Sequence, residues 1–262
     1  MERAIFKRNA MGMRVTPPLS KTISVVIPCF NNQNQITRTV ENLVQEFSDN
    51  KLEHSLELVL IDDASVDDTW KCIERLHAKY LNEVNFKARR LASNVGAYHA
   101  ILAGFEIQKG DGIIVMAADG DDPTGVIVEL IKKWKGENHL VQATRIVLPN
   151  DSNQFFGGVF YTILRLLGTK NVPAGGSDYF LISKDLLDRA ITHGWYAGNT
   201  LIQLFQHANN VDEVPYRKNR SNKSGWTMRK KVNLFLNTIF YSLVKPKTRN
   251  TQSFYEVADS IG

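Results

Sequence analysis

The stretch Leu56–Thr69, LELVLIDDASVDDT, decides the fold, because it joins an apolar run to an acidic turn. The apolar run predicts a buried strand over 56–61, and the residues after the turn predict a helix over 67–79. Asp62 and Asp63 directly follow the predicted strand. Acids at the buried end of a strand need partners. The N–H and O–H donors of a nucleotide base or ribose would serve.

The same strand-then-helix pattern extends to both sides of this stretch. Further strands are predicted over 22–28, 84–91, 112–117, 139–144, 179–183 and 211–216. Further helices are predicted over 34–47, 97–108, 124–134, 155–168, 184–191, 197–208 and 227–243. Strands that alternate with helices imply right-handed crossovers and a mostly parallel sheet. We therefore expect one α/β domain with helices on both faces of the sheet.

Polar and glycine residues cluster where four of the predicted strands end, at 28–32, 62–68, 92–96 and 118–123. Open α/β sheets bind ligands at these carboxyl ends. In the last cluster, Asp119 and Asp121 are two residues apart, so both can point the same way in extended chain. Paired carboxylates attract Mg²⁺ or Mn²⁺, which often share a diphosphate. The alternatives are structural, with Asp122 starting a helix and Asp67 capping one.

Composition points to an ordinary globular protein, with 43% apolar and 23% charged residues in 262. Two cysteines, Cys29 and Cys72, are too few for a disulfide framework, and this favours a reducing, cytoplasmic compartment. The first residues, MERAIFKRNAMGMR, lack the apolar core of a signal peptide. No apolar run is long enough to predict a membrane-spanning helix.

The net charge of +5 is unevenly distributed. Residues 217–249 hold ten of the 32 Lys and Arg residues, and all 27 acidic residues lie elsewhere. Such a segment is a solvated face or a surface for a phosphate-bearing ligand, an anionic membrane or nucleic acid. The helix predicted over 227–243 is amphipathic and basic, which suits either peripheral membrane contact or packing on its own domain.

Taken together, the motifs resemble family 2 glycosyltransferases with the GT-A fold. The resemblance is closest to the dolichyl- and polyprenyl-phosphate mannosyl- and glucosyltransferases, without their membrane-spanning helices. The matching segments in the first half are SVVIPCFNN (24–32), LVLIDDASVDDT (58–69), NVGAYHAILAG (94–104) and IVMAADGDDP (114–123). In the second half, GGSDYFLI (175–182) and RSNKSGWTMRKK (220–231) are similar to segments of that branch.

The resemblance implies an inverting enzyme that moves a sugar from a UDP- or GDP-sugar to a polyprenyl phosphate or another glycan acceptor. It places Pro28, Asn31, Asp62, Asp63, Asn94 and Gly96 around the nucleotide, and Asp119 and Asp121 on the metal and sugar diphosphate. It places Arg145, Arg220, Lys223 and Ser224 against the acceptor or the diphosphate. The expected organisation is an extension over 1–21, a catalytic domain over 22–216, divided at 123 into donor and acceptor halves, and a basic loop and helix over 217–262.

Some residues depart from the pattern of these relatives. Ala117 stands where they often carry a first acid, so Asp119 and Asp121 must hold the metal alone. Asn222 and Gly225 replace the usual glycine and lysine of the basic loop, which weakens the expectation of a lipid-phosphate acceptor. A phosphate acceptor needs no general base, whereas a hydroxyl acceptor does. Asp178 is the carboxylate that we expect to supply it.

Three other functions are considered. A nucleotidyltransferase would carry a Gly- and Lys-rich loop after the first strand, and PCFNNQNQ is not one. A nicotinamide dehydrogenase would carry Gly-x-Gly-x-x-Gly there, which is missing. A catalytically inactive protein that binds a membrane or another anionic partner through 217–249 stays open. Nucleic acid is not an expected partner, and the sequence does not indicate an oligomeric state.

Overall fold

The computed structural model describes residues 21–52, 55–137, 139–146, 176–192, 200–217 and 255–262. The strands are β1 (Thr22–Cys29), β2 (Ser55–Asp62), β3 (Asn85–Leu91), β4 (Gly112–Val115), β5 (His139–Arg145), β6 (Gly176–Ser183), β7 (Asn210–Tyr216) and β8 (Val257–Ile261). The helices are α1 (Ile36–Asp49), α2 (Thr69–Tyr80), α3 (Ala97–Ile107), α4 (Val126–Lys133), α6 (Lys184–Thr192) and α7 (Thr200–His207). The predicted elements within these ranges are confirmed, whereas the helices predicted over 155–168 and 227–243 lie outside them.

The eight strands form one sheet in the order β7-β5-β6-β4-β1-β2-β3-β8. The pairs β1–β2, β1–β4, β2–β3 and β5–β7 are parallel, as predicted. β6 is antiparallel to both of its neighbours, β4 and β5. Its insertion leaves the carboxyl ends of β4 and β5 at the same edge of the sheet as those of β1 to β3.

β8 was not predicted, and it runs antiparallel to β3 at the outer edge of the sheet. Val257–Ile261 lies in the segment 217–262, which we expected to follow the catalytic domain, yet it forms the outermost strand of the sheet. The first four residues of β8 are exposed and Ile261 is half-buried. Its sequence, VADSI, is too short and too polar to give the apolar alternation of a strand.

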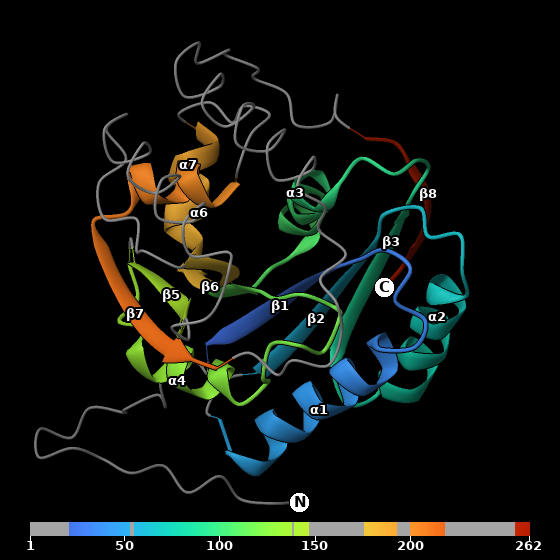
Figure 1. The fold of residues 1–262 in the computed structure, drawn as a ribbon, viewed down its shortest axis with the longest axis horizontal. Helices are drawn as coiled ribbons and strands as arrows, with labels where there is room; N and C mark the ends of the chain where they lie inside the picture. Colours follow the sequence, from blue (N-terminus) through green and yellow to red (C-terminus); the bar gives the residue numbers. More distant parts are fainter. Residues whose placement is uncertain (1–20, 53–54, 138, 147–175, 193–199, 218–254) are drawn as a thin grey trace, which may run out of the picture.

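Helices cover both faces of the sheet, as predicted (Figure 1). α1, α2 and α4 pack on one face through residues such as Leu43, Ile73 and Ile127. α3, α6 and α7 pack on the other through residues such as Ile101 and Leu186. Within the described ranges, no helix combines the length and the apolar character needed to cross a membrane.

Gly104 allows α3 to approach the centre of the sheet closely. A Cβ atom on Gly104 would lie 2.4 Å from Cγ1 of Val26 in β1 and 3.4 Å from Cγ1 of Ile61 in β2. Contacts as short as the first are not tolerated in a packed core. This close packing holds α3 against β1 and β2.

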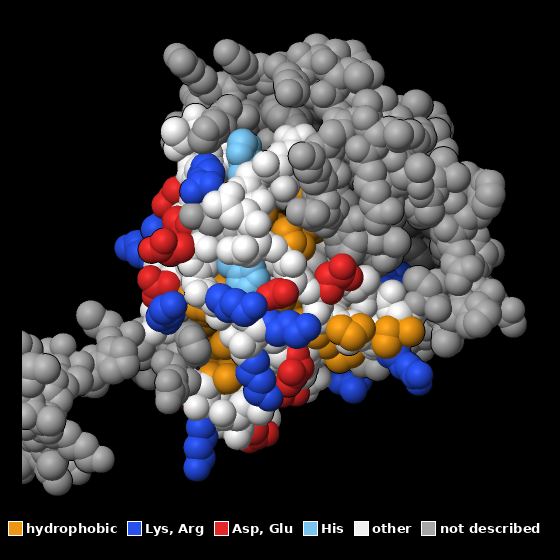
Figure 2. All heavy atoms as spheres, turned by 90° about the vertical axis from the view of Figure 1, so that its left-hand side faces the viewer, with side chains coloured by type: hydrophobic (Ala, Val, Ile, Leu, Met, Phe, Trp, Pro, Cys, Tyr) orange, Lys and Arg blue, Asp and Glu red, His pale blue; other side chains and the backbone are white. Residues whose placement is uncertain are grey.

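The other edge strand, β7, is protected by charges. Lys133 Nζ donates to the Glu213 carbonyl at 2.6 Å, and Lys135 pairs with Asp212 at 3.3 Å. Pro215 lies within the strand, and proline is tolerated in strands chiefly at such edges. Figure 2 views the molecule from this side and shows acidic and basic side chains interspersed over the described part. Mixed charge discourages pairing of this edge with another chain.

A buried polar network ties the amino ends of β1, β2 and β3 together, at the edge opposite the carboxyl ends. Glu57 is fully buried in β2 and accepts hydrogen bonds from the Ser24 hydroxyl and, at 2.7 Å, from the Lys109 N–H. Lys87 Nζ lies 2.6 Å from the Glu57 carboxylate and also donates to the Ile107 carbonyl at 2.9 Å. The ammonium therefore balances the charge of a carboxylate that has no access to water.

Candidate functional site

The loops after β1 and β2 are hydrogen-bonded to each other at the carboxyl edge. The Asn31 N–H donates to Ser65 Oγ at 2.9 Å, and the Val66 N–H donates to Asn31 Oδ1 at 3.0 Å. Asn31 has a positive φ of 55°, which asparagine tolerates better than most residues. Pro28 is half-buried near the end of β1, where it pairs in register with Ile61. These contacts hold the loops after β1 and β2 side by side at the carboxyl edge of the sheet.

Asp62 is fully buried at the end of β2. Its Oδ1 accepts the Ser65 N–H at 3.2 Å. Its Oδ2 lies 3.2 Å from Arg90 Nε, but out of line for a hydrogen bond, and has no hydrogen-bond donor among the described residues. Burial raises the pKa of Asp62 above its usual value, against the opposing effects of Ser65 and Arg90. The charge on Asp62 is thus balanced by Arg90, but its Oδ2 can still accept a hydrogen bond.

Asp63 points to a different partner, the loop between β3 and α3. Its two oxygens accept the N–H groups of Val95 at 2.8 Å and Gly96 at 2.9 Å. Gly96 has a φ of 90°, which favours glycine. Burial raises the pKa of Asp63, although these two hydrogen bonds act against it. Asn94 is exposed and donates through Nδ2 to the Asp63 carbonyl at 3.4 Å, so it also lies beside the site.

Asp67 supports the start of α2, as the sequence suggested, but the N-cap position itself is held by Asp68. Oδ1 of Asp67 accepts the N–H of Thr69, the first residue of α2, at 3.0 Å, and its Oδ2 accepts the Gln33 N–H at 3.2 Å. Burial would raise the pKa of Asp67, but hydrogen bonds from Thr69 and Gln33 outweigh it and lower the pKa. The carboxylate is therefore engaged in holding the two loops and the start of α2.

Asp119 and Asp121 flank a tight turn after β4, and both are half-buried. The Asp121 N–H donates to Asp119 Oδ1 at 3.0 Å, and Gly120 between them has a φ of 71°. The structure brings both acids to the carboxyl edge, as expected. Among the described residues, no group of three or more His, Cys, Asp or Glu side chains is placed to hold a metal ion.

Asp122 does not start a helix, because α4 begins only at Val126. Instead it is buried, and its Oδ1 accepts the Tyr216 hydroxyl at 2.7 Å. The alternative in which Asp122 starts a helix is therefore wrong. Asp122 faces the protein interior, while its neighbours in sequence form the turn.

Two of the residues assigned to the acceptor half lie within the described ranges, and both are at the same edge of the sheet. Arg145 is the exposed last residue of β5. The backbone of Asp178 lies in β6 near the carboxyl end of β4, because Phe180 pairs with Val115. Arg220, Lys223 and Ser224 lie outside the described residues.

Arg90 and Ser65 belong to the site but were not predicted. Arg90 pairs in register with Asp62, and its Nη2 donates to the Ser65 carbonyl at 3.1 Å. A signal was present in the sequence, since both residues stand at or just after the carboxyl ends of predicted strands, 84–91 and 56–61. A buried acid at a strand end implies a cation or hydrogen-bond donor nearby, but the sequence does not say which strand lies beside it.

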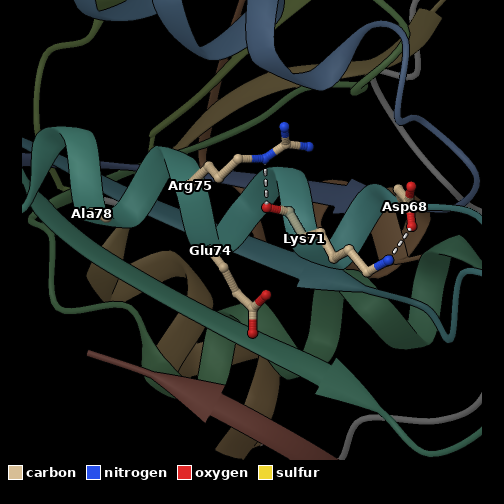
Figure 3. Close-up of a pocket in the computed structure, with 5 residues that line it drawn as sticks. All are labelled: Asp68, Lys71, Glu74, Arg75 and Ala78. Atoms are coloured by element: carbon tan, nitrogen blue, oxygen red, sulfur yellow. Dashed lines mark hydrogen bonds and ion pairs between the residues drawn. The ribbon is translucent and has the colours of Figure 1, made fainter.

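A shallow depression on the outer side of α2 is unrelated to this site. Figure 3 shows it between Asp68, Lys71, Glu74, Arg75 and Ala78, with Lys71 paired to Asp68. The pair is 2.8 Å long, and its side chains are 71% and 59% exposed. Arg75 Nε donates to the Lys71 carbonyl at 3.1 Å. Exposed pairs of this kind contribute little and indicate a solvated helix surface.

The acidic turn after β2 contains a strained residue, Ala64, with a φ of 55°. A left-handed conformation costs a residue with a Cβ atom about 1–2 kcal/mol, whereas glycine adopts it freely. Because glycine also adds unfolded-state entropy worth about 0.4–1 kcal/mol, Ala64→Gly should stabilise the chain by up to about 1.5 kcal/mol. Urea denaturation measures this change. A loss of stability would show that Ala64 does not hold this conformation.

Comparisons with known proteins agree with this geometry. The family model described as "Glycosyl transferase family 2" matches residues 24–190, which span the strand ends that form the site. The chain belongs to glycosyl transferase family 2. The bactoprenol glucosyl transferase of Shigella phage SfV is 29% identical over 168 residues, which cover 63% of this chain and 53% of the relative.

Two solved structures are similar in fold. The glucosyl-3-phosphoglycerate synthase from Mycobacterium tuberculosis, in complex with Mn²⁺, UDP and phosphoglyceric acid, has a TM-score of 0.58 and 15% identity, covering 86% of this chain and 78% of that one. The mannosyltransferase PcManGT from Pyrobaculum calidifontis, in complex with GDP-Man and Mn²⁺, has a TM-score of 0.59 and 16% identity, covering 85% and 64%. The chain therefore has the GT-A fold.

The match to the curated relatives is partial in one respect. The chain spans about half the length of the curated relatives it matches. The comparisons thus establish the family and the fold.

Proposed function

We propose that this chain transfers a sugar from a nucleotide diphosphate sugar to an acceptor, with inversion at the anomeric carbon. The observation that carries the proposal is the buried Asp62 Oδ2, which has no hydrogen-bond donor among the described residues. A buried carboxylate oxygen left in this way costs stability unless a ligand donates to it. The imide or amide N–H of a nucleobase is such a donor, and membership of the family supports this assignment.

The order of the strands suits the length of a nucleotide. Asp62 ends β2, the Asp119–Asp121 turn follows β4, and β1 lies between them. Two strand spacings separate the carboxyl ends by roughly 10 Å. A base at Asp62 would therefore extend its diphosphate toward Asp119 and Asp121. Pro28 and Asn31 would line that path, whereas Asn94 and Gly96, which follow β3, would flank the base on its other side. Asp63 holds the Val95–Gly96 backbone in place there.

The residues of the turn fit a divalent cation, Mg²⁺ or Mn²⁺. Mg²⁺ is commonly bound by one or two carboxylates together with substrate phosphates and water. Two half-buried carboxylates on one turn match that donor set, and no third protein ligand is required. When bound, the cation supplies positive charge for the leaving diphosphate. Asp119 and Asp121 would hold it, with Oδ1 of Asp119 also closing the turn.

The acceptor is proposed to be a polyprenyl phosphate or another glycan precursor. The bactoprenol glucosyl transferase relative supports the first. A phosphate acceptor is anionic already and needs no general base, whereas a hydroxyl acceptor would use Asp178. Arg145, with Arg220, Lys223 and Ser224 from the basic segment, would contact the acceptor or the diphosphate. A lipid-phosphate acceptor would place the reaction at the inner face of the membrane.

The proposal is tested by thermal unfolding with UDP-, GDP- and dTDP-sugars, with and without Mn²⁺. A ligand at about 100 times its Kd stabilises the folded state by roughly 2.7 kcal/mol, which is easily measured. One nucleotide class should raise the melting temperature only with Mn²⁺. Asp62→Ala should abolish that shift, whereas Asp49→Asn on the exposed end of α1 should retain it.

The alternative function is a catalytically inactive protein that uses 217–249 on an anionic partner. No shift with any nucleotide sugar, together with binding to anionic vesicles, would favour it over the enzyme. A Mn²⁺-dependent shift without sugar turnover would limit the proposal to donor binding.

A further inference from the structure

The turn that carries Asp119 and Asp121 is anchored from three directions. On one side, Thr39 in α1 donates through Oγ1 to the Ala118 carbonyl at 3.2 Å. At the other end of the turn, Tyr179 in β6 donates through Oη to the Pro123 carbonyl at 3.3 Å. Tyr216, the last residue of β7, donates to the Asp122 carboxylate at 2.7 Å. Of these three contacts, the one from Tyr216 reaches a side chain of the turn and the other two reach its backbone.

Asp122 and Tyr216 are both buried, with exposed fractions of 8% and 4%. The fully buried Tyr179 packs edge-to-face on Tyr216, with ring centroids 5.9 Å apart and an interplanar angle of 78°. Aromatic pairs prefer this arrangement, so the two rings fix the direction of the Tyr216 hydroxyl. A buried carboxylate that loses a hydrogen bond shifts toward water or another donor. Because Asp122 adjoins Asp121, such a shift would displace the turn.

We propose that Tyr216 is a positioning residue, which holds Asp119 and Asp121 in metal-binding geometry through its hydrogen bond to Asp122. This inference rests on the proposed function of the turn. It links the end of β7, in the acceptor half, to the donor half of the site. The segment that follows β7 carries the basic residues from Arg217 onward, so the strand that leads to the basic segment also fixes the acidic turn.

The test measures Mn²⁺ binding rather than turnover. Free Mn²⁺ is followed by electron paramagnetic resonance in titrations of the full chain, with saturating UDP and, separately, GDP. Residues that orient metal ligands typically change metal affinity 10–100-fold. Tyr216→Phe should therefore raise the Kd for Mn²⁺ by about 10-fold or more. Binding of the nucleotide without metal should stay as in the wild type.

Three further variants make the result specific. Asp122→Ala should weaken Mn²⁺ binding as Tyr216→Phe does. Asp122→Asn keeps an oxygen that can accept the Tyr216 hydroxyl and should retain most of the affinity. Tyr80→Phe is the matched control, because Tyr80 is equally buried but lies on α2. If Tyr216→Phe does not fold, the two Asp122 variants alone decide the question.

The outcomes separate this inference from the proposed function. Wild-type Mn²⁺ affinity in both Tyr216→Phe and Asp122→Ala, with loss of binding in Asp119→Asn, would overturn the positioning role and leave the metal site standing. A wild-type chain that does not bind Mn²⁺ with either nucleotide would overturn both.

Discussion

The Asp119→Asn variant should lose at least about 100-fold in the rate of the proposed sugar transfer while it unfolds at nearly the wild-type temperature. A bound cation is worth several kcal/mol of charge stabilisation at a leaving diphosphate, and each 1.36 kcal/mol corresponds to about tenfold in rate. The turn itself should survive, because an asparagine Oδ1 can still accept the Asp121 N–H that Asp119 accepts at 3.0 Å. Asp121→Asn should behave in the same way.

The measurement is turnover of the donor identified by thermal shift, beside the melting temperature of each variant. Asp49→Asn, which makes the same chemical change on the exposed end of α1, should keep both activity and stability. Unchanged turnover in both Asp119→Asn and Asp121→Asn would remove the metal assignment. A melting temperature that drops by many degrees would show that the acids serve the fold.

Lys87→Met should destabilise the chain by about 3 kcal/mol, since removing one partner of a buried ion pair costs roughly 3–5 kcal/mol. Lys87 is 14% exposed and Glu57 is fully buried, with 2.6 Å between their charged atoms. Methionine fills much of the same volume but leaves the Glu57 charge without a cation. Urea denaturation gives the change in the free energy of unfolding.

Two comparisons make this result interpretable. The double variant Lys87→Met with Glu57→Gln removes the uncompensated charge, so it should be more stable than Lys87→Met alone. Lys79→Met removes a pair of similar length, 2.7 Å to Glu41, but these side chains are 54% and 43% exposed. That surface pair should contribute less than about 1 kcal/mol. If Lys79→Met and Lys87→Met lower the free energy of unfolding equally, the burial of Glu57 does not determine the stability lost with Lys87.

Much of the fold could be predicted from the sequence because, in its first half, the residue pattern of each segment matches the strand or helix that it forms. Runs such as Val25–Ile27 and Leu58–Ile61 are buried on both faces of the sheet and therefore appear as continuous apolar stretches. β6 and β8 show the limit of this approach. The antiparallel direction of β6 has no signature in its own residues, and the few residues of β8 carry no pattern apart from their pairing with β3.

The candidate site could be placed by strand ends, but its internal arrangement could not. Asp62 and Asp63 are neighbours in sequence, yet side chains alternate along extended chain and these two face different loops. Asp62 faces Ser65 and Arg90, whereas Asp63 faces the backbone of Val95 and Gly96. Likewise, the partner of Asp122 lies 94 residues further along the chain. Such pairings depend on strand order, which residue patterns alone do not determine.

The pairing of β8 with β3 has a consequence for the chain during its synthesis. β3 ends at Leu91, and β8 begins at Val257, about 170 residues later. At a translation rate of about 5–20 residues per second, roughly 8–30 s pass between the emergence of the two strands. During that interval a nascent β3 lacks its outer neighbour, and unpaired strand edges invite pairing with other chains. Charged side chains on an edge strand disfavour such pairing, and β3 carries three of them, Lys87, Arg89 and Arg90.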